Sequence, residues 1–219
     1  FNTDDIVVVV DTADITLTAT NNPICFGDST ILIASGTGTF SWFDGSIKDS
    51  ITVKPTTDTE YYVYVMNGKC LIPDTIEIIV NPLPVAIDAG IDKTICLGQT
   101  DTLFALGATN YVWNTLPQST QDTLLVSPSM TTTYILTGID GNGCKNYDTV
   151  VVNVDPVIHA YAGADKLICA GDSVTITATG GVSYNWNTGE NLNAITVAPI
   201  VNTNYSVTVT SINACTASD

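Results

Sequence analysis

The pattern that decides the fold lies in residues 168–189, which are ICAGDSVTITATGGVSYNWNTG. Small or apolar residues alternate with hydroxyl residues from Ser173 to Ala178, and Gly180-Gly181 ends this run. A second short run ends at Trp186 and is followed by asparagine, threonine and glycine. Alternation bounded by turn residues is typical of β-strands with one buried face. We therefore expect two strands joined by a glycine turn.

The same pattern occurs three times, with a period of about 72 residues between equivalent cysteines. The first class of cysteines, each two residues before a glycine, comprises Cys25, Cys96 and Cys169. The second class, each after an asparagine-containing turn, comprises Cys70, Cys144 and Cys215. A tryptophan follows each first-class cysteine by 17 residues, at Trp42, Trp113 and Trp186. A tyrosine follows a proline by six residues in each copy, at Tyr61, Tyr134 and Tyr205.

Each copy contains six or seven short runs of strand-forming residues separated by turns, which is typical of an antiparallel β-sandwich. The tryptophan occupies the place of the core aromatic of the third strand, and the tyrosine begins the penultimate strand. We therefore predict an all-β chain of tandem immunoglobulin-like antiparallel β-sandwich repeats. We expect the three tryptophans and three tyrosines to be core aromatics.

The repeats divide the chain into residues 11–81, 82–154 and 155–219, and residues 1–10 are expected to be the final strand of a preceding repeat. We expect each final strand to start four residues after the second-class cysteine, as at Asp148–Val154 after Cys144. The third repeat is then expected to lack its last strand. Prolines at positions 82, 84 and 156 predict short, stiff junctions.

Regularly placed cysteine pairs in a β-rich chain predict disulfides, whereas zinc would require a Cys-x-x-Cys cluster that the sequence lacks. One scheme joins the cysteines within each repeat: Cys25 to Cys70, Cys96 to Cys144 and Cys169 to Cys215. However, a strand of about six residues spans roughly 20 Å, and a disulfide needs Cα atoms within about 7 Å. A second scheme therefore links neighbouring repeats, through Cys25–Cys144 and Cys96–Cys215. The sequence leaves both schemes open.

The charge of the chain excludes several classes of partner. Six Lys and Arg against 22 Asp and Glu give a net charge of −16, which repels phosphate backbones and anionic lipids. The longest apolar run, Ile6–Val10, is too short to span a bilayer. We expect no nucleic-acid partner and no direct membrane insertion.

No catalytic or cofactor-binding pattern is present in the sequence. The single histidine, His159, lies in a junction without a repeated partner, and no glycine-rich phosphate-binding motif occurs. We therefore expect no enzyme activity and no cofactor. Calcium at the junctions is a minor alternative to a solvated acidic surface, with Asp88 and Asp92, or Asp155 and Asp165, as ligands. The first copy matches poorly, because it has Asp11 and Asp14 there.

The segments ICAGDSVTITATGG (168–181), YNWNTG (184–189), ITVAP (195–199), NYSVTVT (204–210) and VNPLP (80–84) resemble the Ig-like or PKD-like tandem repeats of Bacteroidota surface proteins. The resemblance covers all three copies. It implies very long chains that are exported by the type IX secretion system and act as adhesins or cell-surface filaments.

A second motif, Asp followed by Ser or Thr and then an apolar residue or Thr, resembles the O-glycosylation signature of the same phylum. The hydroxyls at which the resemblance implies glycan are Ser29, Ser50, Thr75, Thr102, Thr123, Thr149 and Ser173. The same motif also arises by composition alone where an edge strand begins with Asp-Thr-Val.

Three similar repeats without catalytic residues favour a structural segment of a long extracellular stalk or filament used in attachment at the cell surface. The expected partners are neighbouring repeats and, in a multi-chain filament, identical chains. An alternative is a carbohydrate- or protein-binding module, for which Phe43 and Tyr111 are the candidate loop aromatics. A further alternative is an accessory domain of a larger secreted protein.

Overall fold

The strands of the chain lie in small antiparallel sheets that face each other in pairs. The computed structural model describes residues 5–8, 14–68 and 70–219, and within them it contains strands and no helix. The chain is an all-β tandem of immunoglobulin-like antiparallel sandwiches, as the sequence predicts. It divides into two compact units, one of Phe1–Val85 with Ile139–Asn146 and the other of Ala86–Gly138 with Tyr147–Asp219. No helix among the described residues is long and apolar enough to cross a membrane.

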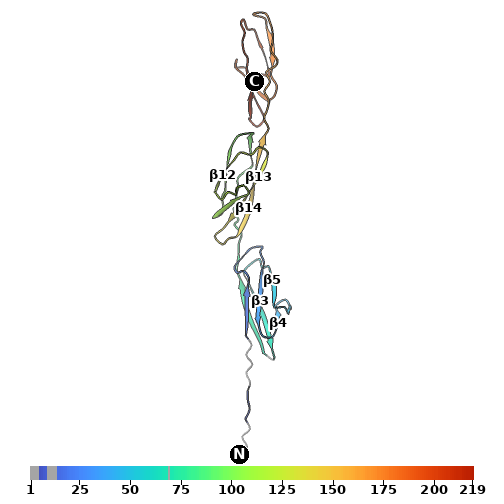
Figure 1. The fold of residues 1–219 in the computed structure, drawn as a ribbon, viewed down its shortest axis with the longest axis vertical. Coiled ribbons are helices and arrows are strands. Elements are labelled where there is room, and N and C mark those ends of the chain that lie inside the picture. The colour runs from blue at the N-terminus through green and yellow to red at the C-terminus, as the bar shows by residue number, and fades with distance from the viewer. Residues whose placement is uncertain (1–4, 9–13, 69) are drawn as a thin grey trace, which may run out of the picture. The chain divides into compact units, whose positions relative to one another are not determined.

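The first sandwich is built from eight strands of the first unit (Figure 1). They are β1 (Ile15–Ala19), β2 (Ile24–Cys25), β3 (Thr30–Gly36), β4 (Thr39–Trp42), β5 (Ser50–Val53), β6 (Thr59–Asn67), β7 (Cys70–Ile78) and β8 (Val80–Asn81). One sheet has the order β1-β3-β5 and the other β4-β6-β7, all antiparallel. The short β2 and β8 pair in parallel and form a separate two-stranded sheet.

The core of this sandwich follows the alternation of the sequence. In β3, Leu32 and Ala34 point inward while Ile31 and Ile33 are exposed. On the facing sheet, Val63 is fully buried, and Trp42 at the end of β4 is 3% exposed. These side chains belong to one hydrophobic cluster between the two sheets.

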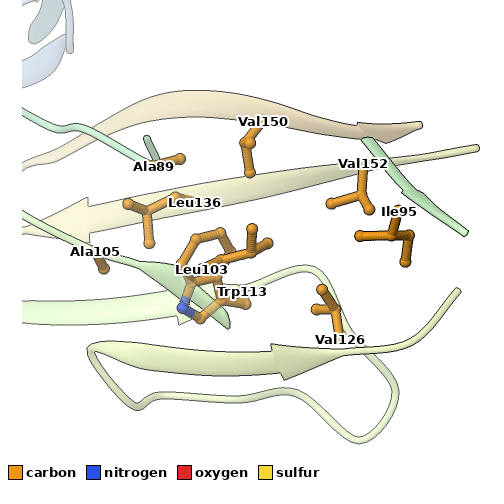
Figure 2. Packing of buried hydrophobic residues seen from close by; sticks show 9 residues of the cluster. All are labelled: Ala89, Ile95, Leu103, Ala105, Trp113, Val126, Leu136, Val150 and Val152. Carbon is orange, nitrogen blue, oxygen red and sulfur yellow. The ribbon is translucent and has the colours of Figure 1, made fainter. Parts of the chain in front are cut away.

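The second sandwich repeats the arrangement with β9 (Lys93–Cys96), β10 (Asp101–Phe104), β11 (Asn110–Trp113), β12 (Thr123–Val126), β13 (Thr132–Ile139) and β14 (Lys145–Asp155). Strand β10 pairs with β12, and the other sheet has the order β11-β13-β14-β9, in which β9 runs parallel to β14. Figure 2 shows its core, where Trp113 lies beside Leu103 and Leu136 between the sheets.

The third sandwich has β15 (Val174–Thr177), β16 (Ser183–Trp186), β17 (Ala194–Val197), β18 (Val207–Thr210) and β19 (Thr216–Ser218). Strand β15 pairs with β17, and β16-β18-β19 form the second sheet. Trp186, Val207 and Val209 are buried in a third, separate cluster.

The expected limits of the final strands need correction. β7 begins at Cys70 itself and β14 at Lys145, directly after Cys144, rather than four residues later. The reason is that the hairpin stays paired up to its turn, as in the pair Asn67 and Cys70. For the same reason the third repeat does not lack its last strand entirely, because β19 pairs with β18.

The strand expected at residues 1–10 falls largely on residues 1–4 and 9–10, which lie outside the described residues. The described part, Asp5–Val8, is exposed and belongs to no strand. The repeat boundaries at 81/82 and 154/155 stay a prediction.

Candidate functional site

The turn between β13 and β14 presents a cysteine at a rigid hairpin tip. The Oδ1 atom of Asp140 accepts hydrogen bonds from the backbone N–H groups of Asn142 and Cys144, both at 2.9 Å. Gly143 has a φ of 82°, a left-handed conformation that glycine adopts without the steric cost of a Cβ. Cys144 is fully buried by these contacts and its surroundings.

The turn between β18 and β19 has the same construction with different residues. The Oγ atom of Ser211 accepts hydrogen bonds from the N–H groups of Asn213, at 3.2 Å, and Cys215, at 3.1 Å. Ala214 takes the left-handed position, with a φ of 65°, as a non-glycine residue. Cys215 is 5% exposed. The hairpin tip is therefore specified by its backbone geometry rather than by one sequence.

Two of the three first-class cysteines, Cys25 and Cys96, lie where a parallel strand pair ends. Cys25 pairs with Asn81 across β2 and β8, and Cys96 pairs with Asp155 across β9 and β14. After each of the three first-class cysteines the chain makes a tight turn, in which the cysteine carbonyl accepts a hydrogen bond from the N–H three residues on. The donors are Asp28 for Cys25, Gln99 for Cys96 and Asp172 for Cys169, at 2.9, 2.9 and 3.0 Å.

The two elements meet in disulfides that follow the second of the two schemes. Cys25 bonds to Cys144 with the Cα atoms 5.5 Å apart, and Cys96 bonds to Cys215 with the Cα atoms 5.6 Å apart. Each disulfide spans 119 residues of sequence and joins two consecutive predicted repeats.

The scheme within repeats is wrong for a geometric reason. Cys25 lies next to Asn81, and Asn81 follows Cys70 by eleven residues along the nearly continuous strands β7 and β8. At about 3.3 Å per residue, Cys25 and Cys70 are therefore on the order of 35 Å apart, at opposite ends of the sandwich. Cys70 is half-buried at the start of β7, and Cys169 is an exposed free thiol.

A carboxylate holds the second hairpin tip in addition to its disulfide. Asp155 accepts hydrogen bonds from Asn213 Nδ2 at 2.7 Å and from Ser211 Oγ at 3.2 Å. At the first hairpin tip, Asn146 Nδ2 donates to the carbonyl oxygen of Pro84 at 2.9 Å. Side-chain hydrogen bonds thus hold each of the two hairpin-tip regions in addition to its disulfide.

Three of the four aspartates considered as calcium ligands already accept hydrogen bonds within the protein. Asp88 accepts a hydrogen bond from Gly90 N–H at 2.7 Å, and Asp92 accepts one from Val151 N–H at 2.8 Å. Asp155 is engaged at the hairpin tip, and Asp165 is exposed. Among the residues that the structure describes, no three potential metal ligands gather. The structure adds no support to a calcium site, and Asp11 lies outside the described residues.

The six repeated aromatics lie in or beside the three cores. Trp42, Trp113 and Trp186 are 3%, 0% and 2% exposed. Each indole N–H donates to a backbone carbonyl in the following loop, at Lys48, Gln121 and Leu192, over 2.7, 3.1 and 2.9 Å. The tyrosines Tyr61, Tyr134 and Tyr205 are half-buried against the same cores. Burial raises the pKa of Tyr61 and of Tyr134 above the ordinary value of 10.0.

A set of aspartates that sequence reasoning missed, which we call the bridging aspartates, connects the end of each sandwich to a segment near its start. The Oδ2 atoms of Asp74, Asp148 and Asp219 accept hydrogen bonds, all at 2.8 Å, from the backbone N–H groups of Leu17, Ala89 and Ala162. The signal in the sequence is that each lies four residues after its second-class cysteine, where the final strand is expected to begin. Asp74 and Asp148 also belong to the glycosylation motif. The motif hydroxyls are exposed at Ser29, Thr75, Thr123, Thr149 and Ser173, and half-buried at Ser50 and Thr102.

Three neighbouring aromatic rings form an exposed row on the first sandwich, which we call the aromatic row: Phe43, Tyr62 and Tyr64. Ring centroids are 6.2 Å apart for Phe43 and Tyr62 and 5.6 Å apart for Tyr62 and Tyr64. The side chains are 40%, 43% and 36% exposed. Tyr62 and Tyr64 stand on the outer face of β6, since Val63 and Val65 between and after them are buried.

The aromatic row belongs to the first sandwich only. The positions equivalent to Tyr62 and Tyr64 are Ile135 and Thr137 in the second copy and Ser206 and Thr208 in the third. Phe43 was a candidate from the sequence, whereas Tyr62 and Tyr64 were missed although their spacing of two predicts one strand face. Tyr111, the other candidate, packs against the second core, and its hydroxyl accepts a hydrogen bond from Ala108 N–H at 3.2 Å.

Comparison with known proteins finds similarity to this chain in fold only. No family model and no curated protein matches the chain. Solved structures with a similar fold include the N-terminal eight Ig domains of DSCAM, at 14% identity over 94% of this chain and 41% of that one, with a TM-score of 0.45. An I-band fragment of titin has 11% identity, coverage of 96% and 97%, and a TM-score of 0.39. Extracellular domains 3–5 of Drosophila OTK have 12% identity, coverage of 93% and 95%, and a TM-score of 0.38. The chain thus spans less than half of the DSCAM structure.

Proposed function

We propose that this chain is a segment of an extracellular stalk or filament that serves in attachment at the cell surface. The observation that supports this most is the pair of disulfides, Cys25–Cys144 and Cys96–Cys215, each of which joins two consecutive repeats. Such links suit a segment under tension, because covalent bonds between repeats limit how far it extends.

Two further features support an extracellular location. Disulfides persist in oxidising compartments outside the cytoplasm, and the sequence resembles repeats that are exported to the surface of Bacteroidota through the type IX system. In a multi-chain filament the partners are identical chains, and the net charge of −16 keeps chains apart unless specific contacts join them. We expect no enzyme activity, no cofactor and no nucleic-acid partner.

The test combines two measurements on the protein isolated from its own cells. Peptide mapping by mass spectrometry without reduction should recover the linked peptides of Cys25 with Cys144 and of Cys96 with Cys215. Immunogold labelling of intact cells with antibodies against these repeats should decorate extended threads at the surface. Label confined to the cell interior, or to a compact secreted protein that carries an enzyme domain, would contradict the proposal and favour the accessory-domain alternative.

Glycosylation of the stalk is a separate part of the proposal. Five of the seven motif hydroxyls are exposed, so a transferase can reach them without unfolding the sandwich. Intact-mass measurement of the native protein should then exceed the mass of the bare chain. A mass equal to that of the bare chain would refute this part and leave the stalk unaffected.

The aromatic row supports a second candidate function, binding of a neutral polysaccharide. Neighbouring rings of the row are turned by 67° and 69° to each other, so ring faces and ring edges alternate along it. An exposed ring face of this kind can stack on the apolar face of a sugar ring. The same outer face carries Thr75, which pairs with Tyr62, and Glu60 and Glu77, which pair at one end and can accept hydrogen bonds from sugar hydroxyls. These carboxylates and the strongly negative chain disfavour polyanions as ligands.

This second function is tested by affinity electrophoresis of the chain through gels that contain a soluble neutral β-glucan or, as a polyanion, alginate. The neutral glucan should retard the chain, and the triple variant Phe43→Ala, Tyr62→Ala, Tyr64→Ala should migrate freely. The matched control is Ile135→Ala with Thr137→Ala at the equivalent positions of the second copy, which should be retarded like the parent. Equal migration of all three proteins in neutral glucan would eliminate the proposal.

A further inference from the structure

Cys169 occupies the position in the third sandwich that Cys25 and Cys96 occupy in the first two. The tight turn after each cysteine is the same, with N–H to carbonyl distances of 2.9, 2.9 and 3.0 Å. The glycine two residues on has a φ of 91°, 89° and 85° at Gly27, Gly98 and Gly171. Cys25 and Cys96 are each bonded to a hairpin-tip cysteine 119 residues later, whereas the thiol of Cys169 is exposed and free.

A groove beside Cys169 is a second, independent sign of a partner. An open cavity of about 580 Å³ is lined by the stretches 162–168 and 199–205 and includes Ala170. In the second sandwich the corresponding stretch, Lys93–Cys96, pairs in parallel with Val152–Asp155 of β14. In the third, Lys166–Cys169 belongs to no strand, and Leu167 is 99% exposed. The groove thus corresponds to the position that the strand segment Val152–Asp155 fills in the second sandwich.

One partner accounts for both the groove and the thiol. In the second sandwich, Val152–Asp155 fills the strand position and leads directly into the repeat whose hairpin tip carries Cys215, the partner of Cys96. We propose that Cys169 is the covalent docking site for the hairpin tip of a further repeat of this kind. The inference rests on the proposed function, since it extends the chain of cross-links by one repeat.

The structure also specifies what the partner tip must contain. In both tips observed, a side-chain oxygen four residues before the cysteine, from Asp140 or Ser211, caps the turn. The residue directly before the cysteine, Gly143 or Ala214, is in the left-handed conformation. A tip with these two features presents its thiol in the orientation in which Cys144 and Cys215 meet their partners.

Formation of the bond is an oxidation and needs an electron acceptor. The thiolate of Cys169 attacks a sulfur of an oxidised dithiol oxidoreductase or of oxidised glutathione and displaces one thiolate. The thiolate of the partner cysteine then attacks the Cys169 sulfur of this mixed disulfide and displaces the second thiolate. Two thiols become one disulfide, and one disulfide of the oxidant becomes two thiols.

The test uses the full chain extended after Asp219 by a second copy of residues 149–219. We expect this joint to preserve the fold, because Asp148 and Asp219 hold equivalent positions, each accepting a backbone hydrogen bond at 2.8 Å from a residue near the start of its repeat, Ala89 or Ala162. The protein is refolded in a glutathione redox buffer and mapped without reduction. We expect the peptide of Cys169 to be linked to the appended copy of Cys215 within a monomer, with Cys25–Cys144 and Cys96–Cys215 intact.

The matched control is the same extended chain with Cys169→Ser, in which the appended cysteine should react fully with iodoacetamide while the other two disulfides remain. A band of twice the mass without reduction, linked through Cys169 to a hairpin-tip cysteine, would support the docking site and assign the partner to a second copy. Complete alkylation of Cys169 in a chain that keeps the other two disulfides would overturn this inference alone. Absence of those two disulfides would instead remove the main support for the stalk.

Discussion

At the scale of single residues, each sandwich depends on one tryptophan whose ring and indole nitrogen both have partners. The ring of Trp113 is fully buried between the sheets (Figure 2). Its Nε1 donates to the carbonyl of Gln121, which fixes the loop before β12. The equivalent bonds at Trp42 and Trp186 show that this arrangement recurs in every copy. The same tryptophan side chain therefore packs in the core and holds the following loop in place.

We expect Trp113→Ala to destabilise the second sandwich by about 3–5 kcal/mol, because it opens a cavity in a closed core and leaves the Gln121 carbonyl without its donor. Urea denaturation followed by circular dichroism measures the change. Met130→Ala in the same repeat is the matched control, since Met130 is 70% exposed and its truncation should cost less than about 0.5 kcal/mol. Equal midpoints for the two variants would contradict the role assigned to Trp113.

The pair of Lys93 and Asp101 makes the second sandwich sensitive to acid. The Lys93 ammonium donates to Asp101 Oδ1 at 2.9 Å and, with the Thr102 N–H, holds the pKa of Asp101 below its ordinary value of 3.8, against the opposing effect of burial. A carboxyl whose pKa is lower in the folded state contributes stability above its unfolded pKa. That contribution is lost as the pH falls through the lower folded value.

Asp101→Asn should therefore lower the stability of the second sandwich by a few tenths to about 1 kcal/mol at neutral pH, as expected for a pair about one-third exposed. The difference from the parent should shrink as the pH falls below 3.8, because the unfolded parent then takes up a proton at Asp101 that the folded parent binds only at lower pH. Urea midpoints measured between neutral pH and pH 3 give this difference directly. A difference that stays constant below pH 3.8 would show that the effect is not the ionisation of Asp101.

At the scale of strands, the bridging aspartates connect the end of each sandwich to a segment near its start. Asp148 on β14 accepts a hydrogen bond from Ala89 N–H, a backbone donor that is part of the buried edge of the core. We expect Asp148→Ala to destabilise the sandwich by about 1.5–3 kcal/mol, the usual value for a hydrogen bond to a charged group. Asp148→Asn should lose less stability than Asp148→Ala, because its amide oxygen can still accept the hydrogen bond from Ala89.

Thermal unfolding monitored by circular dichroism tests this order of stabilities. Asp165→Ala, which removes an exposed aspartate, should leave the midpoint near that of the parent. Faster exchange of the Ala89 amide hydrogen in Asp148→Ala, compared with the parent, would locate the effect at the bridge. Unchanged exchange at Ala89 would show that the aspartate acts elsewhere.

The strands and cores were predictable from sequence because one periodicity determines them, and the connections between elements were not. Alternation places Leu32 and Ala34 inside, and a spacing of 17 residues from a cysteine identifies Trp42. The bridging role of Asp74 depends instead on a backbone N–H of another strand, at Leu17, which no local pattern encodes. The aromatic row was partly missed because Tyr62 and Tyr64 face outward on a strand, whereas binding residues were expected in loops.

At the scale of the whole molecule, the two disulfides interlock in sequence. Cys96 lies between Cys25 and Cys144, and Cys144 lies between Cys96 and Cys215. The shortest covalent path from one end to the other therefore uses only residues 1–25, 96–144 and 215–219. Each sandwich has residues that lie off this path, in loops closed by the disulfides. These residues bear no tension while the disulfides are intact. This arrangement limits extension without requiring a stronger core.

The limit can be measured by stretching single molecules that are held at both ends. At about 3.6 Å per residue, the oxidised chain should reach a contour length of roughly 280 Å and the reduced chain roughly 790 Å. Either double variant, Cys25→Ser with Cys144→Ser or Cys96→Ser with Cys215→Ser, should reach roughly 360 Å, because either remaining disulfide removes the same number of residues from the path. If the cysteines were instead bonded within repeats, the first double variant would retain only a link between Cys169 and Cys215 and would extend to roughly 630 Å. The second double variant would then retain only a link between Cys25 and Cys70 and would also extend to roughly 630 Å. Lengths near 360 Å for both double variants would therefore support the interlocked arrangement and, with it, a segment built to limit extension under tension.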